Sequence, residues 1–379
     1  MDENQAQLFY NMVENPRYLE EQIITYLGNK RALLPFIGQG INYVRQRLNK
    51  DKLSIVDLFS GSGIVSRYFK QFANRLIVND LELYSKTINS CYLANKSQID
   101  FVFLENIYSD LLKLITVEKH TGFISELYSP RNEESITISD RVFYTKRNAT
   151  YIDTARYHID SIPESYKPYF LAPLLYEASV HTNTSGVFKG FYKSADGIGQ
   201  FGGQGKNALS RILKDINLQL PIFSNFECDY TINQMDACSY FLSHNDEVDL
   251  LYLDPPYNQH PYGSNYFMLN LITKYERPEQ ISGVSGIPEN WNRSNFNKKQ
   301  SAFSELFSII RNCNAKFILI SYNSEGFISQ QEFIDELNKI GIVKTFETRY
   351  NTFRGSRNLM NRSTHVTEYL YLVEKKYGT

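Results

Sequence analysis

The stretch LSIVDLFSGSGIVSRYFKQF, Leu53–Phe72, joins an apolar run to a glycine turn and then to an amphipathic helical pattern. A second apolar run, RLIVND, follows directly and ends at Asp80. This order of strand, turn, helix and strand is typical of a parallel sheet, whose ligands bind at the carboxyl ends of the strands. Gly61 and Gly63 let the backbone turn tightly and approach a ligand where a Cβ atom would clash. The stretch therefore predicts an α/β fold with a ligand site at the glycine turn.

Asp80 lies nineteen residues after Gly61, where an acid suits the ribose diol of a nucleoside-containing cofactor. The pattern FxGxG lacks the third glycine of a dinucleotide-binding turn, because Ser66 occupies that position. A pyrophosphate needs a bare helix N-terminus, whereas S-adenosylmethionine carries no phosphate and needs only the close approach and the acid. The turn thus favours S-adenosylmethionine over a pyridine dinucleotide, with a tight βα turn beside surface acids as the alternative.

Three later apolar runs continue the sheet pattern: VDLLYLDPPY from residue 248, KFILISYN from 316 and THVTEYLYLVEKK from 364. Between residues 116 and 225 this pattern is lost, and a glycine-rich part there is too long for an ordinary connection. A second polar insertion spans residues 271–303. The chain therefore predicts one α/β domain, residues 1–115 and 226–379, interrupted by a large and a small insertion.

The segment DPPY, Asp254–Tyr257, ends the apolar run LLYL, at the edge of the sheet where ligands gather. Pro255 and Pro256 have no N–H group, which leaves the Asp254 carboxylate and the Pro255 carbonyl as fixed acceptors. Two such acceptors suit the –NH2 group of adenine or cytosine and can direct its lone pair toward a methyl donor. Tyr257 can stack on the base that carries the amine. The alternative is a strand-ending turn capped by an Asp.

The net charge of the 379-residue chain is −1 and its pI is about 6.6, so nucleic-acid binding has to come from local basic patches. Three stretches without acids, residues 180–195, 292–303 and 348–367, are compatible with one electropositive cleft around DPPY. The candidate DNA-binding residues are Lys189, Lys193, Trp291, Arg293, Lys298, Lys299, Arg354, Arg357 and Arg362. Solvated loops that happen to lack acids are the alternative for each stretch.

The N-terminal sequence MDENQAQLFYNMVENPRY does not have the pattern of a secretory signal, and no run of about 18 apolar residues predicts a membrane span. The four cysteines show no Cys/His ligand spacing, which indicates reduced thiols in a cytoplasmic protein and predicts no metal site. His260, just after DPPY, is not expected to be a catalytic base, because water can remove the acidic proton of a methylated amine.

With both segments in view, the chain resembles the S-adenosylmethionine-dependent DNA adenine methyltransferases of the Dam-like (alpha) class. TYLGNK, residues 25–30, resembles the N-terminal motif of that class, and the order of cofactor turn, insertion and DPPY is the same. The resemblance covers residues 20–100 and 226–375 and includes the late segments ISYNSEGFI and TFRGSRNLMNRSTHVTEYLYL. DPPYNQHPYGSNYF with a late FRGSRN resembles methylases of type IIS restriction systems, such as the FokI modification enzyme, more than Dam.

This resemblance implies a Rossmann-like methyltransferase sheet, mostly parallel with an antiparallel C-terminal strand, and a target-recognition insertion at 116–225. The smaller insertion at 271–303 would contact DNA. The implied cofactor-binding residues are Tyr26, Lys30, Asp57, Phe59, Gly61, Gly63, Asp80 and Asp236, and the implied catalytic residues are Asp254, Pro255, Pro256 and Tyr257. Lys30 as a helix-end cation and Asp236 as an ordinary helix cap are the alternatives.

The implied function is site-specific N6 methylation of adenine in double-stranded DNA, by base flipping and direct methyl transfer without a metal. A bacterial cytoplasmic enzyme of a restriction-modification system, monomeric and with a cognate restriction endonuclease, is expected. An RNA adenine or protein glutamine methyltransferase, a non-catalytic nucleic-acid-binding module and a dinucleotide oxidoreductase are the alternative functions.

Overall fold

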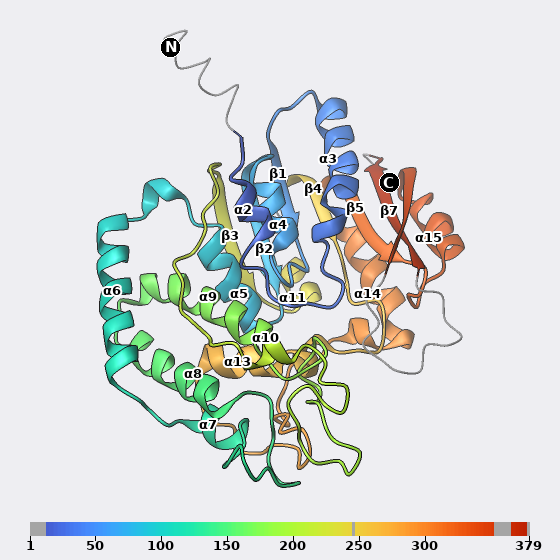
Figure 1. Ribbon diagram of the computed structural model, residues 1–379. Coiled ribbons are helices and arrows are strands. Elements are labelled where there is room, and N and C mark those ends of the chain that lie inside the picture. The colour runs from blue at the N-terminus through green and yellow to red at the C-terminus, as the bar shows by residue number, and fades with distance from the viewer. Residues whose placement is uncertain (1–12, 245–246, 352–364, 377–379) are drawn as a thin grey trace.

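The computed structural model describes residues 13–244, 247–351 and 365–376. Its centre is a seven-stranded sheet with the order β3-β2-β1-β4-β5-β7-β6. β7 runs antiparallel to both of its neighbours, β5 and β6, and the other pairs are parallel. The sheet occupies the upper part of Figure 1, and helices fill the lower left part.

The strands are β1 (Leu53–Asp57), β2 (Ala73–Asp80), β3 (Asp229–Gln234), β4 (Val248–Leu253), β5 (Ala315–Asn323), β6 (Gly341–Asn351) and β7 (His365–Lys375). The helices are α2 (Pro16–Glu20), α3 (Leu34–Leu48), α4 (Ile64–Lys70), α5 (Leu83–Tyr92), α6 (Phe101–Val117), α7 (Phe123–Leu127), α8 (Lys146–Ile159), α9 (Lys167–Val180), α10 (Leu209–Leu213), α11 (Ala237–Ser243), α12 (Tyr262–Asn265), α13 (Phe267–Lys274), α14 (Lys299–Asn312) and α15 (Gln330–Leu337). Short 3₁₀ turns lie at Arg31–Leu33, Lys96–Gln98, Glu164–Tyr166 and Asn295–Asn297.

Helices cover both faces of the sheet, as the alternation of side chains along each strand requires. On one face, Ile55 of β1 and Leu250 of β4 share a hydrophobic core with α3 and α4. On the other face, the next residues along the same strands, Val56 and Leu251, pack with α11, α14 and α15. Every residue of β4 is buried, which explains why the apolar run before DPPY is continuous.

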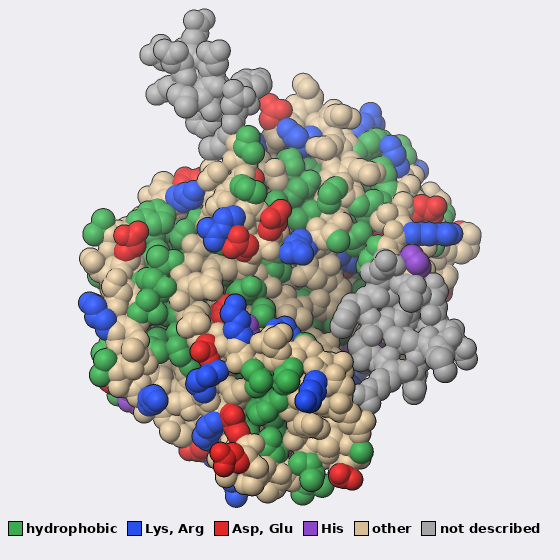
Figure 2. Space-filling model, viewed as in Figure 1, with side chains coloured by type: hydrophobic (Ala, Val, Ile, Leu, Met, Phe, Trp, Pro, Cys, Tyr) green, Lys and Arg blue, Asp and Glu red, His purple; other side chains and the backbone are tan. Residues whose placement is uncertain are grey.

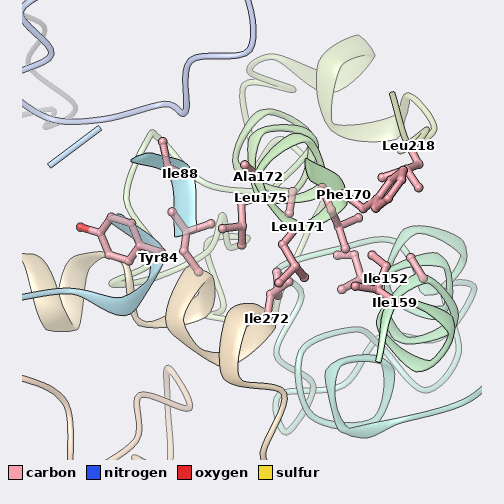
Figure 3. Packing of buried hydrophobic residues seen from close by; sticks show 14 of the residues in the cluster. Tyr84, Ile88, Ile152, Ile159, Phe170, Leu171, Ala172, Leu175, Leu218 and Ile272 are labelled. Carbon is pink, nitrogen blue, oxygen red and sulfur yellow. The ribbon is translucent and has the colours of Figure 1, made fainter. Parts of the chain in front are cut away.

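A third hydrophobic core lies among helices beside the sheet and draws on α5, α6, α8, α9 and α13. Figure 3 shows α9 at its centre, with side chains from several neighbouring elements around it. The labelled members are Tyr84, Ile88, Ile152, Ile159, Phe170, Leu171, Ala172, Leu175, Leu218 and Ile272. Residues 116–225 add no strand to the sheet of the described chain, and they share this core with helices on either side of them in sequence. Their role in target recognition stays a prediction.

The smaller predicted insertion, residues 271–303, begins inside α13 and ends inside α14. Between these helices the chain forms an irregular segment with one isolated bridge, between Ile281 and Pro288. A hydrogen bond from Tyr128 Oη to the Gly286 carbonyl, 2.7 Å, ties this segment to the larger insertion. The two sequence insertions therefore contact each other in the folded chain, while the contact of either one with DNA stays a prediction.

Charged side chains of both signs are interspersed over the face of the molecule seen in Figure 2, as the near-zero net charge leads one to expect. All four cysteines are free thiols, and three of them are buried. Within the described ranges, none of the helices combines the length and the apolar character that a membrane span requires.

Candidate active site

A cavity open to solvent, enclosing about 920 Å³ of space with its mouth included, lies at the carboxyl ends of β1, β2 and β4. Nine of the twelve residues predicted for cofactor binding and catalysis line it: Tyr26, Lys30, Phe59, Gly61, Asp80, Asp236, Asp254, Pro256 and Tyr257. Asp57, Gly63 and Pro255 are not among its lining residues. The sheet topology thus brings the FSGSG and DPPY segments, almost two hundred residues apart in sequence, to one site.

The glycine turn after β1 holds Asp80 in place through the backbone. Asp80 Oδ2 accepts a hydrogen bond from the Gly61 amide, 2.7 Å, and Asp80 Oδ1 accepts one from the Glu82 amide, 2.9 Å. Burial raises the pKa of Asp80 to about 6, against the effect of these hydrogen bonds. Gly61 has φ +50°, and a Cβ atom there would lie 3.0 Å from the ring of Tyr26. Glycine is therefore required at this position, both for the backbone conformation and for the close approach of Tyr26.

Tyr26 joins the N-terminal segment to the tail of DPPY. Its ring stacks on Tyr266 with a centroid distance of 4.7 Å and on Tyr262 with one of 5.0 Å. The Leu27 amide donates a hydrogen bond to Tyr266 Oη, 2.6 Å, and Tyr262 Oη donates one to the Leu27 carbonyl, 3.3 Å. Two of the aromatic residues after DPPY thus hold the segment that resembles the family's N-terminal motif.

Lys30 connects the DPPY carboxylate with an acid on the last strand of the sheet. Its ammonium lies 3.3 Å from Asp254 Oδ1 and donates a hydrogen bond of 2.5 Å to Glu368 Oε1. Both Lys30 and Glu368 are fully buried, and Ser321 of β5 also donates to Glu368 Oε1, 2.6 Å. One cation between two carboxylates gives an arrangement in which each charge depends on the others.

The pKa values follow from this arrangement. Burial raises the pKa of Asp254 to about 7, with Lys30 opposing the rise and Glu368 adding to it. Burial also disfavours the charge on Lys30, but Asp254 and Glu368 outweigh it and raise the pKa of Lys30 well above its ordinary value. Lys30 therefore stays an ammonium near neutral pH, whereas Asp254 changes its charge there.

The remaining predicted residues have structural partners. Asp57 at the end of β1 accepts a hydrogen bond from Ser66 Oγ, 2.5 Å, and burial raises its pKa to about 7. Gly63, with φ +76°, precedes the first turn of α4. Asp236 lines the cavity and also caps α11, since its Oδ1 accepts from two backbone amides of that helix. The alternative interpretation of Asp236 as a helix cap is thus part of what this residue does.

Comparison with known proteins gives the family. Residues 26–335 match the D12 class N6 adenine-specific DNA methyltransferases, which is most of the chain and includes both segments of the cavity. The chain belongs to the D12 class of N6 adenine-specific DNA methyltransferases. Its activity is accordingly methylation of DNA adenine, and the sheet with its single antiparallel strand is the methyltransferase sheet predicted from the sequence. The non-catalytic module and the dinucleotide oxidoreductase find no support in this match.

Known relatives of this D12 methyltransferase are enzymes of restriction-modification systems. The type II methyltransferase M.NlaIII of Neisseria lactamica is 29% identical over 93% of the chain and 100% of its own length. The type II methyltransferase M.CviAII of Paramecium bursaria Chlorella virus 1 is 30% identical over 92% of the chain and 98% of its own length. M.FokI of Planomicrobium okeanokoites is 28% identical over 92% of the chain, which spans 52% of that enzyme. The predicted likeness to the FokI modification enzyme is thus confirmed.

Basic residues of two predicted DNA-binding stretches in the D12 methyltransferase are solvent-accessible. Lys298 and Lys299 are exposed, and the adjacent Asn297 lines the cavity and donates to the Asn258 carbonyl, 2.9 Å. Arg293 is exposed and lies over the half-buried ring of Trp291, with 4.2 Å from its guanidinium carbon to the ring centroid. This stretch therefore borders the cavity.

The second stretch carries Lys189, which is exposed, and Lys193, whose ammonium lies 5.0 Å from the centroid of the Phe191 ring. The Phe188 amide donates to the Asn265 carbonyl, 2.7 Å, and so fixes this stretch beside α12, just after DPPY. Arg354, Arg357 and Arg362 of the third stretch lie outside the described residues. His260 is exposed in the loop after DPPY, where its backbone amide donates to Asn258 Oδ1.

Several cavity residues of the D12 methyltransferase were not predicted. Asn79 joins three strand ends, since its side chain donates to the Leu58 and Met235 carbonyls at 3.2 and 3.1 Å. Glu82 lines the cavity and accepts from Asn270 and Asn292. Asn79 and Glu82 flank the predicted Asp80 in sequence, so their position at the carboxyl end of β2 was the available signal. Tyr262, Asn292, Ser294 and Asn297 also line the cavity, whereas Glu368 reaches the site only through Lys30.

Proposed function

We propose that this D12 methyltransferase moves a methyl group from S-adenosylmethionine to the N6 amine of an adenine flipped out of double-stranded DNA. The observation that carries the proposal is the position of the Asp254 carboxylate, at the cavity wall and 3.3 Å from a buried lysine. S-adenosylmethionine, when bound, supplies an electrophilic methyl group. The adenine nitrogen forms its bond to that methyl as the sulfur–carbon bond breaks, and the amine proton then leaves to water.

The residues around the cavity fit S-adenosylmethionine. Asp80 uses each carboxylate oxygen for one backbone hydrogen bond, which leaves further lone pairs for the two hydroxyl groups of a ribose. Tyr26 brings an aromatic ring to the turn at Gly61, where a side chain would block the approach. The wall at this turn consists of Gly61, Ser60 and Ser62 and carries no Lys or Arg, as suits a ligand without phosphate.

The acceptors for the adenine amine come from DPPY. Asp254 is held by Lys30, so that its carboxylate has a fixed direction, and the two prolines offer no competing donor. The amine would donate two hydrogen bonds, to the Asp254 carboxylate and the Pro255 carbonyl. These would draw the nitrogen out of conjugation with the ring and direct its lone pair toward the methyl group. Tyr257 lines the same cavity and can stack on the base, which offsets part of the few kcal/mol that flipping costs.

Replacement of Asp80 by alanine is expected to weaken S-adenosylmethionine binding about 10- to 100-fold, because hydrogen bonds to a charged group are lost. Titration calorimetry with the cofactor measures this change. Asp80→Asn keeps an acceptor for the Gly61 amide and should lose less affinity. DNA affinity in a gel-shift assay should stay the same for both variants. An equal loss of DNA and cofactor affinity would contradict a cofactor role.

Methyl transfer at saturating cofactor and DNA is expected to rise with pH through about 7. The reason is that burial raises the pKa of Asp254 to about 7. Only the deprotonated carboxylate can accept hydrogen bonds on both oxygens, because the protonated form carries an O–H donor. Activity should therefore be largely lost at pH 5.5 and fully present at pH 8.5, about 1.5 units to either side of that pKa. Burial also raises the pKa of Glu82 to about 7. Glu82→Gln should not move the acid limb of the pH profile, the range in which activity falls as the pH is lowered, whatever it does to the maximal rate.

The substrate and setting belong to the same proposal. The basic residues that border the cavity would hold the DNA backbone. The type II name of the relatives favours a cognate endonuclease, and a monomeric enzyme of the bacterial cytoplasm is part of the same proposal. Transfer of a tritiated methyl group to duplex DNA, single-stranded DNA and RNA, followed by analysis of the modified base, tests the substrate. N6-methyladenine should form in duplex DNA, and preferential labelling of RNA would contradict the proposal and favour the RNA alternative.

A further inference from the structure

Two histidines and a glutamate meet outside the cavity, at the end of α6 and the last turn of α8. Glu118 Oε2 lies 2.9 Å from His120 Nε2 and 3.2 Å from His158 Nε2. The three ligand atoms all lie within 4.8 Å of one another. No step of the proposed methyl transfer uses these residues, and none of them lines the cavity. They lie beside α6 and on α8, at the left of Figure 1.

The backbone around this cluster is fixed independently of its side chains. The His120 amide donates to Thr154 Oγ1, 3.0 Å, and this hydroxyl group donates to the Thr150 carbonyl within α8. His158 follows Thr154 by four residues, so both project from the same face of α8. The His120 ring also stacks on Tyr157, with a centroid distance of 3.7 Å and an interplanar angle of 19°. The loop after α6 is therefore docked on α8 with its imidazole in place.

Within this cluster, the most buried nitrogen has no hydrogen bond. His158 is only 7% exposed, and its Nε2 has no hydrogen-bond partner among the described residues although it lies 3.2 Å from Glu118 Oε2. Glu118 has no ion pair with Lys or Arg in the part of the chain that the structure describes. The Glu118 carboxylate and the imidazole nitrogens of His120 and His158 thus lie close together.

We propose that Glu118, His120 and His158 bind one divalent transition-metal ion of the zinc class. Zinc bonds of about 2.0–2.2 Å at tetrahedral angles place neighbouring ligand atoms about 3.3 Å apart, close to the two separations in this cluster. The half-exposed Glu118 and His120 leave room for a water molecule as the fourth ligand. The ion ties the end of α6 to α8, across forty residues of sequence, and so fixes the start of the larger insertion.

The ligand set selects the metal. Two imidazole nitrogens and one carboxylate suit Zn²⁺ and its first-row neighbours, whereas Mg²⁺ and Ca²⁺ prefer oxygen ligands throughout. The carboxylate alone would be a surface acid, but the two imidazole nitrogens within 4.8 Å of it add the selectivity. We therefore expect Zn²⁺ and Co²⁺ to bind and millimolar Mg²⁺ not to compete.

The full chain, stripped of metal with EDTA and then freed of the chelator, provides the test. Titration calorimetry with ZnCl2 should show one ion per chain, and Tm should rise by several degrees when Zn²⁺ is present. With Co²⁺ as the probe, the visible absorption bands should be those of nitrogen and oxygen ligands. A thiolate charge-transfer band would assign the ion to a cysteine and overturn the proposal, as would the absence of binding.

Variants locate the site. Glu118→Gln and His120→Asn should each weaken Zn²⁺ binding about 100-fold or more, since loss of a ligand exceeds the 10- to 100-fold effect of outer contacts. The Glu118 side chain is 43% exposed, so its variant should fold, and circular dichroism checks this. His181→Gln is the matched control: His181 lies 3.4 Å from Glu177 but has no second imidazole beside it. Unchanged affinity in the two ligand variants, or an equal loss in the control, would overturn the proposal.

Discussion

Replacement of Asp254 by alanine is expected to lower methyl transfer to duplex DNA about 10³-fold, the upper range for removal of one oriented transition-state group. The variant loses the carboxylate that would bind the adenine amine, and no other carboxylate replaces it at the end of β4 in the described chain. Initial rates with a tritiated methyl donor, at saturating cofactor and DNA, measure the effect.

Binding measurements show whether this loss is catalytic. Asp254→Ala should bind S-adenosylmethionine almost as well as the parent chain, because Asp80, the proposed ribose ligand, keeps its hydrogen bond with the Gly61 amide. Asp335→Ala, which removes an exposed acid from α15, should keep full activity and serves as the matched control. Retained methyl transfer in the Asp254 variant would remove the central assumption about DPPY.

Replacement of Lys30 by methionine is expected to lower the rate about 10²-fold or more and to move the acid limb of the pH profile to higher pH. The sign follows from charge: Lys30 lowers the pKa of Asp254, so its removal lets that pKa rise further. Two buried carboxylates then lack their cation, which should lower the free energy of unfolding by about 3–5 kcal/mol. Thermal unfolding and rate measurements from pH 6 to pH 10, about three units above the present pKa, test both effects.

Glu368→Gln is expected to shift the same limb in the opposite direction. Glu368 raises the pKa of Asp254, so its neutral replacement lets that pKa fall. Glu374→Gln, six residues later on β7 and paired with Arg47 at the surface, is the matched control and should leave the limb in place. Lys344→Met, on β6, is the corresponding control for Lys30. The acid limbs of Lys30→Met and Glu368→Gln should thus move in opposite directions, which a general loss of stability would not produce. Shifts of both limbs in the same direction would contradict the proposed coupling through Lys30.

The parts of the site that were predicted from sequence are those where local chemistry is unusual. Gly61 and Gly63 allow backbone conformations that other residues rarely adopt, and the two prolines after Asp254 restrict the backbone. Such residues have few structural explanations, and the cavity contains both segments. β3 and β6 were not predicted, because they are the edge strands of the sheet and their residues alternate between half-buried and exposed positions. An apolar run signals only a strand with both faces covered, such as β4.

Contacts between distant segments explain the rest of what sequence patterns did not predict. Glu368 stands in an apolar strand as an isolated acid, and nothing local indicates that its partner lies 338 residues earlier. Tyr262 and Tyr266 both stack on Tyr26, and no local pattern indicates this contact. Glu118 and His120 are close in sequence, but His158 completes the cluster only because α6 and α8 are neighbours in the fold. Such pairs require knowledge of the packing.

The position of β7 has a consequence for the synthesis of this enzyme. β7 comes last among the described strands, yet it lies between β5 and β6 and brings Glu368 to Lys30 near the start of the chain. On the ribosome, Lys30 therefore stays without this anion until β7, 338 residues later, has been made. Because such long-range pairing is slow, the catalytic site should be among the last parts of the molecule to assemble. A nascent or prematurely terminated chain would thus carry the cofactor turn without being able to methylate DNA.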